Sequence, residues 1–324
     1  MSSARRVSVS SFAKVNLDLR VLHRRADGFH EIRSLFHTIS LADRMEISFA
    51  KGPALELSTE CPGVDVPQEE NLAHRAAQVF AERVNLRGRL RISIEKKIPL
   101  GGGLGGGSTN AASVLLALPA LTRMPIALPE LLELAARLGS DVPFFMQGGS
   151  AIALGRGEEL YPAPDFPSLF GLLVAPGIAV STPEAYRSLA RGTESAASAR
   201  IMREFSSQFV AVAAAAAKWC SRWDGSNFGV NDFEAPVFLA HPSLLSWKSK
   251  LKSAGAIHAM MSGSGSSVFG LFRSGDAARK AAKQLQGGDV RIFRMLSRRR
   301  YQQIWHRSLH PYSDQLWPPH PQTA

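Results

Sequence analysis

Six glycines lie within the seven residues 101–107, in the run P-L-G-G-G-L-G-G-G-S-T-N-A-A that begins at Pro99. An alternating apolar strand over 90–94 precedes this run, and an alanine- and leucine-rich helix is expected over 109–121. Glycine at such density costs backbone order, so a fold retains it where the chain approaches another group closely or adopts positive φ. A strand, a glycine loop and a helix start together present backbone N–H groups to an anion, most often phosphate. Ser108 or Thr109 is expected to cap this helix, or to offer its hydroxyl to the phosphates or their metal.

Three other interpretations of the glycine loop are less favoured. A flexible linker is not normally placed between a buried strand and a helix, and a Walker A loop requires a lysine after the glycines, which this chain lacks. Gly101, Gly103 and Gly106 satisfy G-x-G-x-x-G, but a dinucleotide-binding unit returns to a second parallel strand. Here a second helical pattern, over 129–138, follows the first. The match to a dinucleotide-binding motif is therefore interpreted as accidental.

The composition indicates a globular protein with room for two domains. The 324 residues are 45% hydrophobic, which allows two sizeable cores. No apolar run reaches about 18 residues, and the first ten residues resemble neither a signal peptide nor a convincing transit peptide. Cys61 and Cys220 are far apart, which suits a reducing compartment and gives no metal-site spacing. We therefore expect a cytoplasmic protein, a monomer or weak homodimer, with no membrane partner.

The formal net charge of +11 permits nucleic acid or anionic small molecules as partners. Much of the excess lies near the C-terminus, where Arg291 and Arg294 precede the run Arg298–Arg300. Such a run is more often a solvated surface than a binding site. We expect 297–324 to be a basic, flexible tail and no nucleic acid to bind, with an RNA-binding protein as the less favoured alternative.

The N-terminal part of the chain shows clear strand patterns. A first strand is expected over 7–12, followed by A-K-V-N-L-D-L-R-V over 13–21, whose polar side chains are expected to lie on a solvent-exposed face. The Asp-Gly turn in R-A-D-G-F-H-E, residues 25–31, places the next two side chains at a loop tip. Residues 45–49 and 55–58 are expected to form a hairpin. An amphipathic helix is predicted over 71–84.

Later segments add two further candidate features. Asp141 follows the 129–138 helix among apolar neighbours, where a carboxylate is costly unless paired; taken alone, such an aspartate is usually a helix cap. Tyr186 lies in the first turn of a helix expected to start at Thr182. The closing part of the chain predicts a small α+β sandwich that contains the glycine turn S-G-S-G-S-S over 262–267.

Six motifs of this chain, in this order, resemble those of the GHMP kinases. They are S-F-A-K-V-N-L-D-L (11–19), R-A-D-G-F-H-E-I (25–32), the glycine loop (99–112), G-S-D-V-P-F-F (139–145), N-D-F-E (231–234) and M-S-G-S-G (261–265). The resemblance extends from about residue 8 to residue 295. It implies a two-domain α+β fold. An N-terminal α/β ATP-binding domain would cover 1–160 and a C-terminal ferredoxin-like α/β sandwich 161–296, with the active site between them.

The resemblance also implies a reaction, in which ATP phosphorylates an alcohol with the assistance of Mg²⁺. Lys14 and Asp141 stand at the positions of the family's catalytic pair. An alcohol is a poor nucleophile until its proton is accepted, which a carboxylate within hydrogen-bond reach can do. A nearby ammonium stabilises the developing charge, and phosphoryl transfer otherwise needs mainly positioning and charge neutralisation.

The family's binding residues map onto further positions of this chain. The expected ATP-binding residues are Asn71, Lys96, Pro99, Leu100, Gly101, Gly102, Gly103, Leu104, Gly105, Gly106, Gly107, Ser108 and Thr109. The expected substrate-binding residues are Asn16, Phe29, His30, Thr182, Tyr186, Gly263 and Gly265. No metal ligands are assigned.

The D-G-F-H motif and Tyr186 favour one branch of the family, which acts on a cytidine-diphosphate-linked methylerythritol in the non-mevalonate route to isoprenoids. In that branch two aromatic rings enclose the cytosine base. Phe29 replaces the more frequent tyrosine, which keeps the stacking face and loses a hydroxyl. A mevalonate- or sugar-type kinase of the same family is the alternative.

Overall fold

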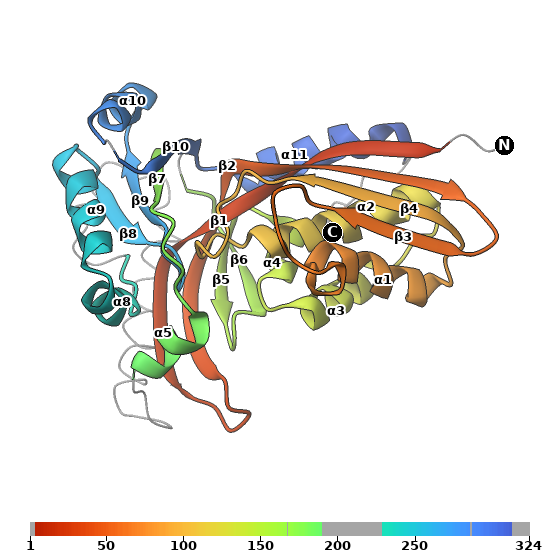
Figure 1. Ribbon diagram of the computed structural model, residues 1–324, viewed down its shortest axis with the longest axis horizontal. Helices are drawn as coiled ribbons and strands as arrows, with labels where there is room; N and C mark the ends of the chain where they lie inside the picture. Colours follow the sequence, from red (N-terminus) through yellow and green to blue (C-terminus); the bar gives the residue numbers. More distant parts are fainter. Residues whose placement is uncertain (1–3, 167, 190–228, 286, 313–324) are drawn as a thin grey trace.

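The structure, a computed structural model, describes residues 4–166, 168–189, 229–285 and 287–312. It consists of two β-sheets, each with helices packed on it, joined by a long antiparallel pair of strands (Figure 1). This is the two-domain α+β architecture that the resemblance implied. The described helices include none long and apolar enough to cross a membrane.

The long pair consists of β1 (Arg5–Arg24) and β2 (His30–Lys51). β2 is the centre of the first sheet, whose order is β3-β4-β2-β5-β6, with β1 also paired to β2. The remaining strands are β3 (Leu55–Glu60), β4 (Gly88–Glu95), β5 (Ser150–Leu154) and β6 (Glu159–Ala163).

The hairpin expected between 45–49 and 55–58 is wrong. β3 pairs in parallel with β4, and β4 lies between β3 and β2. The short helix η1 (Gln68–Glu70) and helix α1 (Leu72–Val84) connect β3 to β4. A crossover of this kind is what parallel neighbours require, because a tight turn can join only antiparallel strands.

Helices cover one face of the first sheet. The three helices expected in this part of the chain are present, as α1, α2 (Gly106–Thr122) and α3 (Leu128–Leu138). The short helix α4 (Val142–Gln147) follows them. α2 is buried along almost its whole length, because α1, α3, α4 and β1 pack around it. The result is a single apolar core that fixes both the start of α2 and the start of α4.

The second sheet is antiparallel in the order β10-β7-β9-β8. Its strands are β7 (Phe170–Ala175), β8 (His258–Met261), β9 (Val268–Phe272) and β10 (Asp289–Arg294). Helices α8 (Glu234–Ala240), α9 (Pro242–Ser253) and α10 (Gly275–Gln284) belong to the same half of the molecule as this sheet. Helix α5 (Thr182–Ser188) lies beside the lower end of the β1–β2 pair in Figure 1. This arrangement matches the expected α/β sandwich. The helix expected around 205–219 lies outside the described residues.

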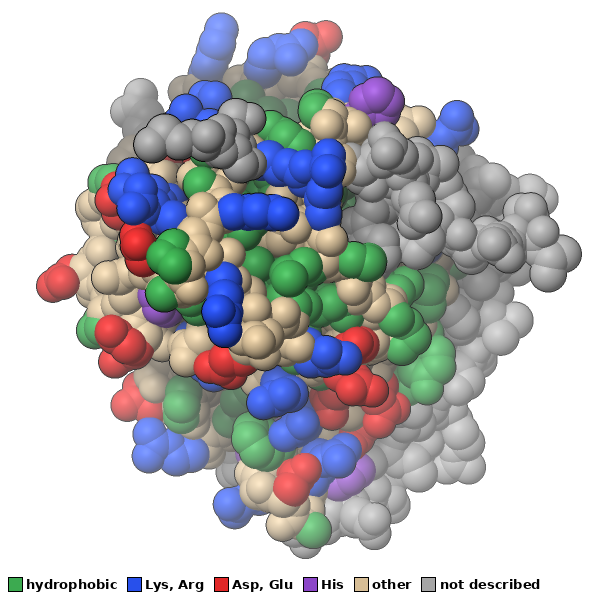
Figure 2. Space-filling model, turned by 90° about the vertical axis from the view of Figure 1, so that its right-hand side faces the viewer, with side chains coloured by type: hydrophobic (Ala, Val, Ile, Leu, Met, Phe, Trp, Pro, Cys, Tyr) green, Lys and Arg blue, Asp and Glu red, His purple; other side chains and the backbone are tan. Residues whose placement is uncertain are grey.

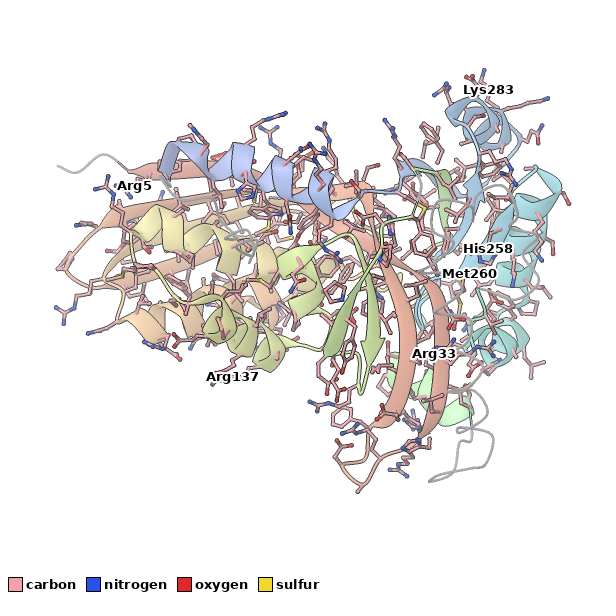
Figure 3. All side chains as sticks on the ribbon, turned by 180° about the vertical axis from the view of Figure 1, so that it is seen from behind. Arg5, Arg33, Arg137, His258, Met260 and Lys283 are labelled. Atoms are coloured by element: carbon pink, nitrogen blue, oxygen red, sulfur yellow. The ribbon has the colours of Figure 1, made fainter. Side chains whose placement is uncertain are left out.

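The two sheets share a core at their junction. Met260 of β8, seen from behind in Figure 3, belongs to a buried cluster with residues of β1 and β2 such as Leu17 and Ile39. The first sheet extends to Ala163, so the boundary expected at 160 falls inside β6.

The flexible tail expected from residue 297 is wrong for residues 298–312. Helix α11 (Arg298–Leu309) returns to the first sheet and buries Tyr301, Trp305 and Leu309 in the first core, and the short helix η2 (His310–Tyr312) follows. The charged run concealed this amphipathic helix, because three arginines begin it before its apolar positions recur at four-residue spacing. Residues 313–324 lie outside the described part.

Candidate active site

Lys14 and Asp141 come together between the two sheets. The Lys14 Nζ lies 3.3 Å from an Asp141 carboxylate oxygen, although the residues are far apart in the chain. The Lys14 side chain is 5% exposed and that of Asp141 is 30% exposed. One member of the pair is therefore held inside the protein, while the other is open to a small molecule.

Local irregularities of β1 direct Lys14 toward the site. The register of β1 against β2 shifts between Phe12 and Lys14 and again between Asn16 and Asp18. Such bulges reorient side chains and are common beside active sites. Lys14, Asn16 and Asp18 are consequently buried, contrary to the solvent-exposed face expected from the alternation.

A chain of hydrogen bonds fixes the Lys14 ammonium. Lys14 Nζ donates to Asn16 Oδ1 at 2.8 Å, and Asn16 Nδ2 donates to Ser34 Oγ at 2.7 Å. The ammonium also lies 4.6 Å from the centre of the Phe36 ring. Asn16 thus supports Lys14, and both residues line one cavity, which is described below.

Asp141 stands at the N-cap position of α4 and makes no side-chain capping hydrogen bond. The capping role, which is the usual explanation for an aspartate at such a position, therefore does not account for this carboxylate. It faces Lys14 instead. Pro143 lies in the first turn of α4, where the missing N–H costs nothing.

The glycine loop is joined directly to the lysine-bearing strand. The Lys14 backbone N–H donates to the Leu104 carbonyl at 3.0 Å, and the Leu104 side chain is buried. On the other side of the loop, a Cβ at Gly105 would lie 2.7 Å from the Phe145 ring of α4. The loop, β1 and α4 therefore form one packed unit that holds the Lys14–Asp141 pair.

A second glycine turn presses against the loop. A Cβ at Gly103 would lie 2.0 Å from the Ser262 carbonyl oxygen, and one at Gly265 would lie 2.4 Å from the Gly103 nitrogen. Ser262 Oγ also donates to the Gly103 carbonyl at 3.0 Å. Several of these glycines therefore serve the contact between the two segments, whereas Gly263 reaches the wall of the cavity.

The expectation that Ser108 or Thr109 caps the helix is wrong. Gly105, at φ 70°, is the N-cap of α2, and the first intrahelical bond runs from the Thr109 N–H to the Gly105 carbonyl at 2.8 Å. A glycine cap arises here because the chain enters the helix through a left-handed residue. The N–H groups of the first turn, at 106–108, have no intrahelical acceptor, which is the arrangement that binds phosphate.

The remaining predicted ATP residues surround this loop to different degrees. Leu100 is 64% exposed and Gly101 and Gly107 are exposed, while Gly102 and Thr109 are buried. Pro99, Gly106 and Ser108 are partly buried. Asn71 caps α1 by accepting from the Ala73 N–H, a structural task that the sequence interpretation did not assign to it.

Lys96 lies next to the first turn of α2, with its Nζ 3.1 Å from the position of a Cβ at Gly106. Its ammonium binds Asp43, a buried carboxylate that also accepts from the backbone N–H groups of Lys97 and Ile98 at 2.7 and 2.8 Å. Asp43 thus holds the backbone of the segment that connects β4 to the glycine loop. Sequence reasoning missed it, because nothing local distinguishes it from a surface aspartate of a strand.

The predicted aromatic residues lie close together near the turn that joins β1 to β2. His30 and Tyr186 stack directly, with ring centres 4.9 Å apart and planes 24° apart, and Phe29 is 56% exposed at the loop tip. Burial, and to a smaller degree the Arg24 guanidinium, lowers the pKa of His30. Burial, and less so the Asp141 carboxylate, raises the pKa of Tyr186 to about 12. Both groups are therefore neutral at neutral pH and present hydrogen-bonding edges.

Two cavities connect these features. The inner one, of about 220 Å³, contains Lys14, Asn16 and Asp141 together with Gly103, Gly105 and Gly263 in its wall. The outer one, of about 780 Å³, contains Phe29 and His30 in its wall. Thr182 and Tyr186 belong to both, and Thr182 Oγ1 lies 2.9 Å from Ser264 Oγ of the glycine turn. The two cavities therefore adjoin, with the aromatic residues at one and the Lys14–Asp141 pair at the other.

Two further residues, Arg156 and Asn231, contribute to the site although neither was predicted as a site residue. Arg156 also belongs to both cavities. Asn231 Nδ2 donates to the carbonyls of Met261 and Gly263, at 2.9 and 2.7 Å, and so holds the second glycine turn. The motif N-D-F-E was visible in the sequence, and its structural task could have been found only from the partners it meets.

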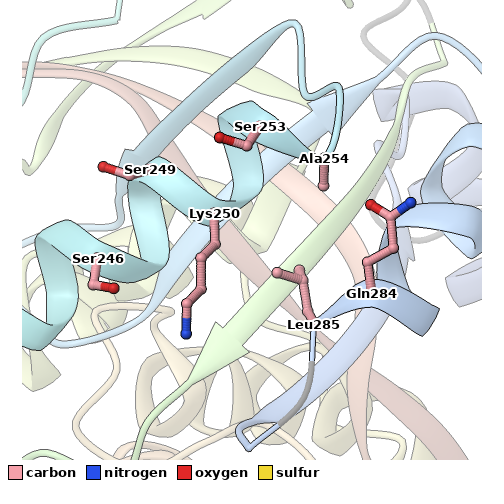
Figure 4. Close-up of a pocket in the computed structure, with 7 residues that line it drawn as sticks. All are labelled: Ser246, Ser249, Lys250, Ser253, Ala254, Gln284 and Leu285. Atoms are coloured by element: carbon pink, nitrogen blue, oxygen red, sulfur yellow. The ribbon is translucent and has the colours of Figure 1, made fainter.

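Another cavity, of about 480 Å³, opens between α9 and the end of α10 (Figure 4). Its wall includes three serines, Lys250 and Leu285, and none of the predicted site residues. Lys250 lies 4.4 Å from the centre of the Trp247 ring, so its position is explained by packing. The predicted site residues that line a cavity therefore lie at the first two cavities.

In the described part of the chain, no group of three or more His, Cys, Asp or Glu side chains could hold a metal ion. Mg²⁺ in phosphoryl-transfer sites commonly takes only one or two protein ligands and completes its shell with phosphates and water. The Ser108 hydroxyl, in the first turn of α2, fits this donor set.

Comparison with known proteins shows which families and enzymes this chain resembles. Residues 71–149 match the family described as GHMP kinases N terminal domain, and residues 212–288 match GHMP kinases C terminal. The chain is 43% identical, over 98% of both chains, to the 4-diphosphocytidyl-2-C-methyl-D-erythritol kinase of Solibacter usitatus (strain Ellin6076). It is 39% identical to the same kinase of Moorella thermoacetica (strain ATCC 39073 / JCM 9320), over 86% of this chain and 95% of that protein.

Solved structures give the same result. The crystal structure of a 4-(cytidine 5'-diphospho)-2C-methyl-D-erythritol kinase is similar with a TM-score of 0.72 and 36% identity, over 89% of this chain and 98% of the other. Homoserine kinase from Cytophaga hutchinsonii shares the fold, with a TM-score of 0.65 and 18% identity, over 89% of this chain and 94% of the other.

Proposed function

The chain belongs to the GHMP kinase family, and we propose that it transfers the γ-phosphate of ATP to the 2-hydroxyl of 4-diphosphocytidyl-2-C-methyl-D-erythritol. This reaction belongs to the non-mevalonate route to isoprenoid precursors. The observation that carries the proposal is the Lys14–Asp141 pair, which lies in a cavity that adjoins the aromatic pocket. Gly103 and Gly105 of the glycine loop belong to the wall of the same cavity as the pair.

The reaction divides between these groups as follows. The Asp141 carboxylate accepts the proton of the 2-hydroxyl as that oxygen attacks the γ-phosphorus. The new O–P bond forms while the bond between the γ-phosphorus and the β,γ-bridging oxygen breaks, and ADP departs. The Lys14 ammonium, held by Asn16, stabilises the negative charge on the reacting oxygens.

The phosphates of ATP are proposed to bind at the start of α2. The first-turn N–H groups and the helix dipole favour an anion there, and Lys96 adds a positive charge beside Gly106. Mg²⁺, which the Ser108 hydroxyl would help to hold, would neutralise phosphate charge when it is bound.

The aromatic pocket is proposed to bind the cytosine base. Phe29 and Tyr186 supply faces for stacking, and neutral His30 supplies a hydrogen-bond donor and acceptor for the base edge. Because the His30 ring stacks on Tyr186 in this structure, the His30 ring must move if the base is to stack on the same face of Tyr186.

The test is a coupled assay for ADP release. We expect release that depends on 4-diphosphocytidyl-2-C-methyl-D-erythritol, with none on mevalonate, galactose or homoserine. Activity on mevalonate alone would show instead a mevalonate-type kinase, the alternative within the family. That alternative leaves the His30–Tyr186 pocket without a task, because such a substrate has no base.

The alternative outside this enzyme class, an RNA-binding protein, receives little support from the arginine run. Arg298 donates to the carbonyls of Gly148 and Ser150 and so helps to fix α11 on the core. The end of the molecule seen in Figure 2 carries many Lys and Arg side chains, with Asp and Glu among them. Exchange of the exposed Arg299 and Arg300 for Ala, measured by a salt-dependent RNA shift assay, tests this alternative. A cytoplasmic location and a monomeric or weakly dimeric state remain predictions.

A further inference from the structure

Of the described residues, three belong to both cavities, and Arg156 is the charged one among them. Thr182, Tyr186 and Arg156 each contribute to the wall of the inner cavity around Asp141 and to that of the outer cavity around Phe29. Thr182 and Tyr186 are neutral. Any molecule that extends from one cavity into the other therefore passes the Arg156 guanidinium, which is the one charged group at the junction in the described part of the chain.

The backbone of Arg156 is held firmly. It lies in the turn 155–157 between β5 and β6, where the Gly155 N–H donates to Glu31 Oε1 at 3.0 Å and the Gly155 carbonyl accepts from the Ile32 N–H at 2.7 Å. The Arg156 N–H donates to Glu158 Oε2 at 2.7 Å. The turn is thus fixed to β2, which also carries His30.

The guanidinium, in contrast, is free to change partners. Its Nε donates to Glu158 Oε1 at 3.3 Å, and its Cζ lies 4.9 Å from the centre of the Phe29 ring. The side chain is 41% exposed. An exposed ion pair and an exposed cation–π contact are each worth about 1 kcal/mol or less. A stronger anion can therefore displace both contacts.

The proposed substrate supplies such an anion. Its base and its reacting hydroxyl are separated by a diphosphate, so that base binding beside Phe29 and reaction at Asp141 place the diphosphate near the junction. A guanidinium binds phosphate oxygens through two parallel N–H···O bonds. Arg24 and Arg187 also belong to the wall of the outer cavity, but not to that of the inner one.

We propose that the Arg156 side chain binds the diphosphate of the substrate and so fixes the distance between the base and the reacting hydroxyl. This inference rests on the proposed function. It makes Arg156 a specificity-determining residue, which selects a nucleoside diphosphate over a nucleoside.

The test compares the binding of CDP with that of cytidine by titration calorimetry at about 0.15 M salt, where charges more than about 8 Å apart are screened. We expect Arg156→Ala to weaken CDP binding about 10- to 100-fold, the range for loss of a charge-assisted hydrogen bond, and to change cytidine binding less than about twofold. Arg156→Lys should fall between the two, because an ammonium cannot form the paired bonds. In the coupled assay, Arg156→Ala should raise the KM for the substrate much more than it lowers kcat.

Two matched variants separate a contact from a general loss of charge. Arg187→Ala removes a charge from the outer cavity only, and Arg279→Ala removes an exposed charge on α10 that pairs with Asp276. Both should weaken CDP binding by less than about threefold, because exposed charges are largely screened. If Arg187→Ala weakens CDP binding as much as Arg156→Ala does, the proposal is overturned, because CDP would then be attracted by the overall positive charge of the pocket and not by a specific contact.

Equal losses of CDP and cytidine binding in Arg156→Ala would also overturn it, and would show that the residue supports the base pocket through Phe29. Failure of the proposed function gives a different pattern, in which the wild-type protein binds neither ligand and releases no ADP with the cytidine substrate. A wild-type thermal midpoint in the variants verifies that each is folded.

Discussion

The contact between the two glycine segments makes a sharp prediction for Gly103→Ala. A Cβ at residue 103 would lie 2.0 Å from the Ser262 carbonyl oxygen, and the residue has φ +72°. Gly101 offers a matched control, because its φ is +65° and a Cβ there would meet nothing within 4 Å. The two substitutions share the backbone strain and differ in the steric contact.

The magnitudes follow from these two terms. A non-glycine residue in the left-handed region costs about 1–2 kcal/mol, which is the whole expected cost of Gly101→Ala. At residue 103 the two segments must in addition separate by at least 1 Å to reach the 3.0 Å that real Cβ contacts require. Overpacking of this kind costs about 1–3 kcal/mol more, so Gly103→Ala should lower the free energy of unfolding by about 2–5 kcal/mol.

Urea unfolding of both variants measures this difference, and steady-state kinetics measures its effect on the site. The displaced segments form the wall around Asp141, and a misplacement near 1 Å can reduce turnover about 100-fold. We therefore expect Gly103→Ala to lose far more turnover than Gly101→Ala. Equal stability and equal turnover of the two variants would refute the argument that these glycines serve the close approach.

Three further predictions address other parts of the protein. Asp141→Asn should leave ADP binding unchanged and reduce turnover about 10²–10⁴-fold, the usual contribution of a general base; unaltered turnover would remove Asp141 from the mechanism. Trp305→Ala should lower the free energy of unfolding by about 3–5 kcal/mol because the indole is 2% exposed in the core, and a loss below about 1 kcal/mol in urea unfolding would show that α11 is not part of the fold. Burial, and less so Arg298, lowers the pKa of His37 to about 3, so the unfolded chain binds the proton first as the pH falls below about 6.5, and stability should fall by up to about 1.4 kcal/mol per pH unit from this residue. Urea midpoints between pH 7 and 4.5 should decline less steeply in His37→Asn; an identical slope would contradict this assignment.

Much of the secondary structure could be predicted from local patterns. Residues 258–261 and 268–272 form the expected strands, and α1 covers all but the first residue of the helix expected over 71–84. The failures share a cause. The pairing of β3 with β4 and the return of α11 to the first core depend on which distant surfaces meet, and no local pattern reports that. Residue type alone also suggested a solvent-exposed position for Lys14. Two register shifts in β1 instead direct its side chain into the protein interior.

The sequence by itself determined the kind of chemistry available. Glycine density before a helix predicts an anion site, because only backbone N–H groups and a helix dipole are required, and these are properties of a single segment. The tertiary structure decided what these parts do together. It placed Lys14 3.3 Å from Asp141, set the second glycine turn against the loop, and put Arg156 at the junction of the two cavities. Such distances between remote residues result from the packing of whole elements, which a linear pattern does not contain.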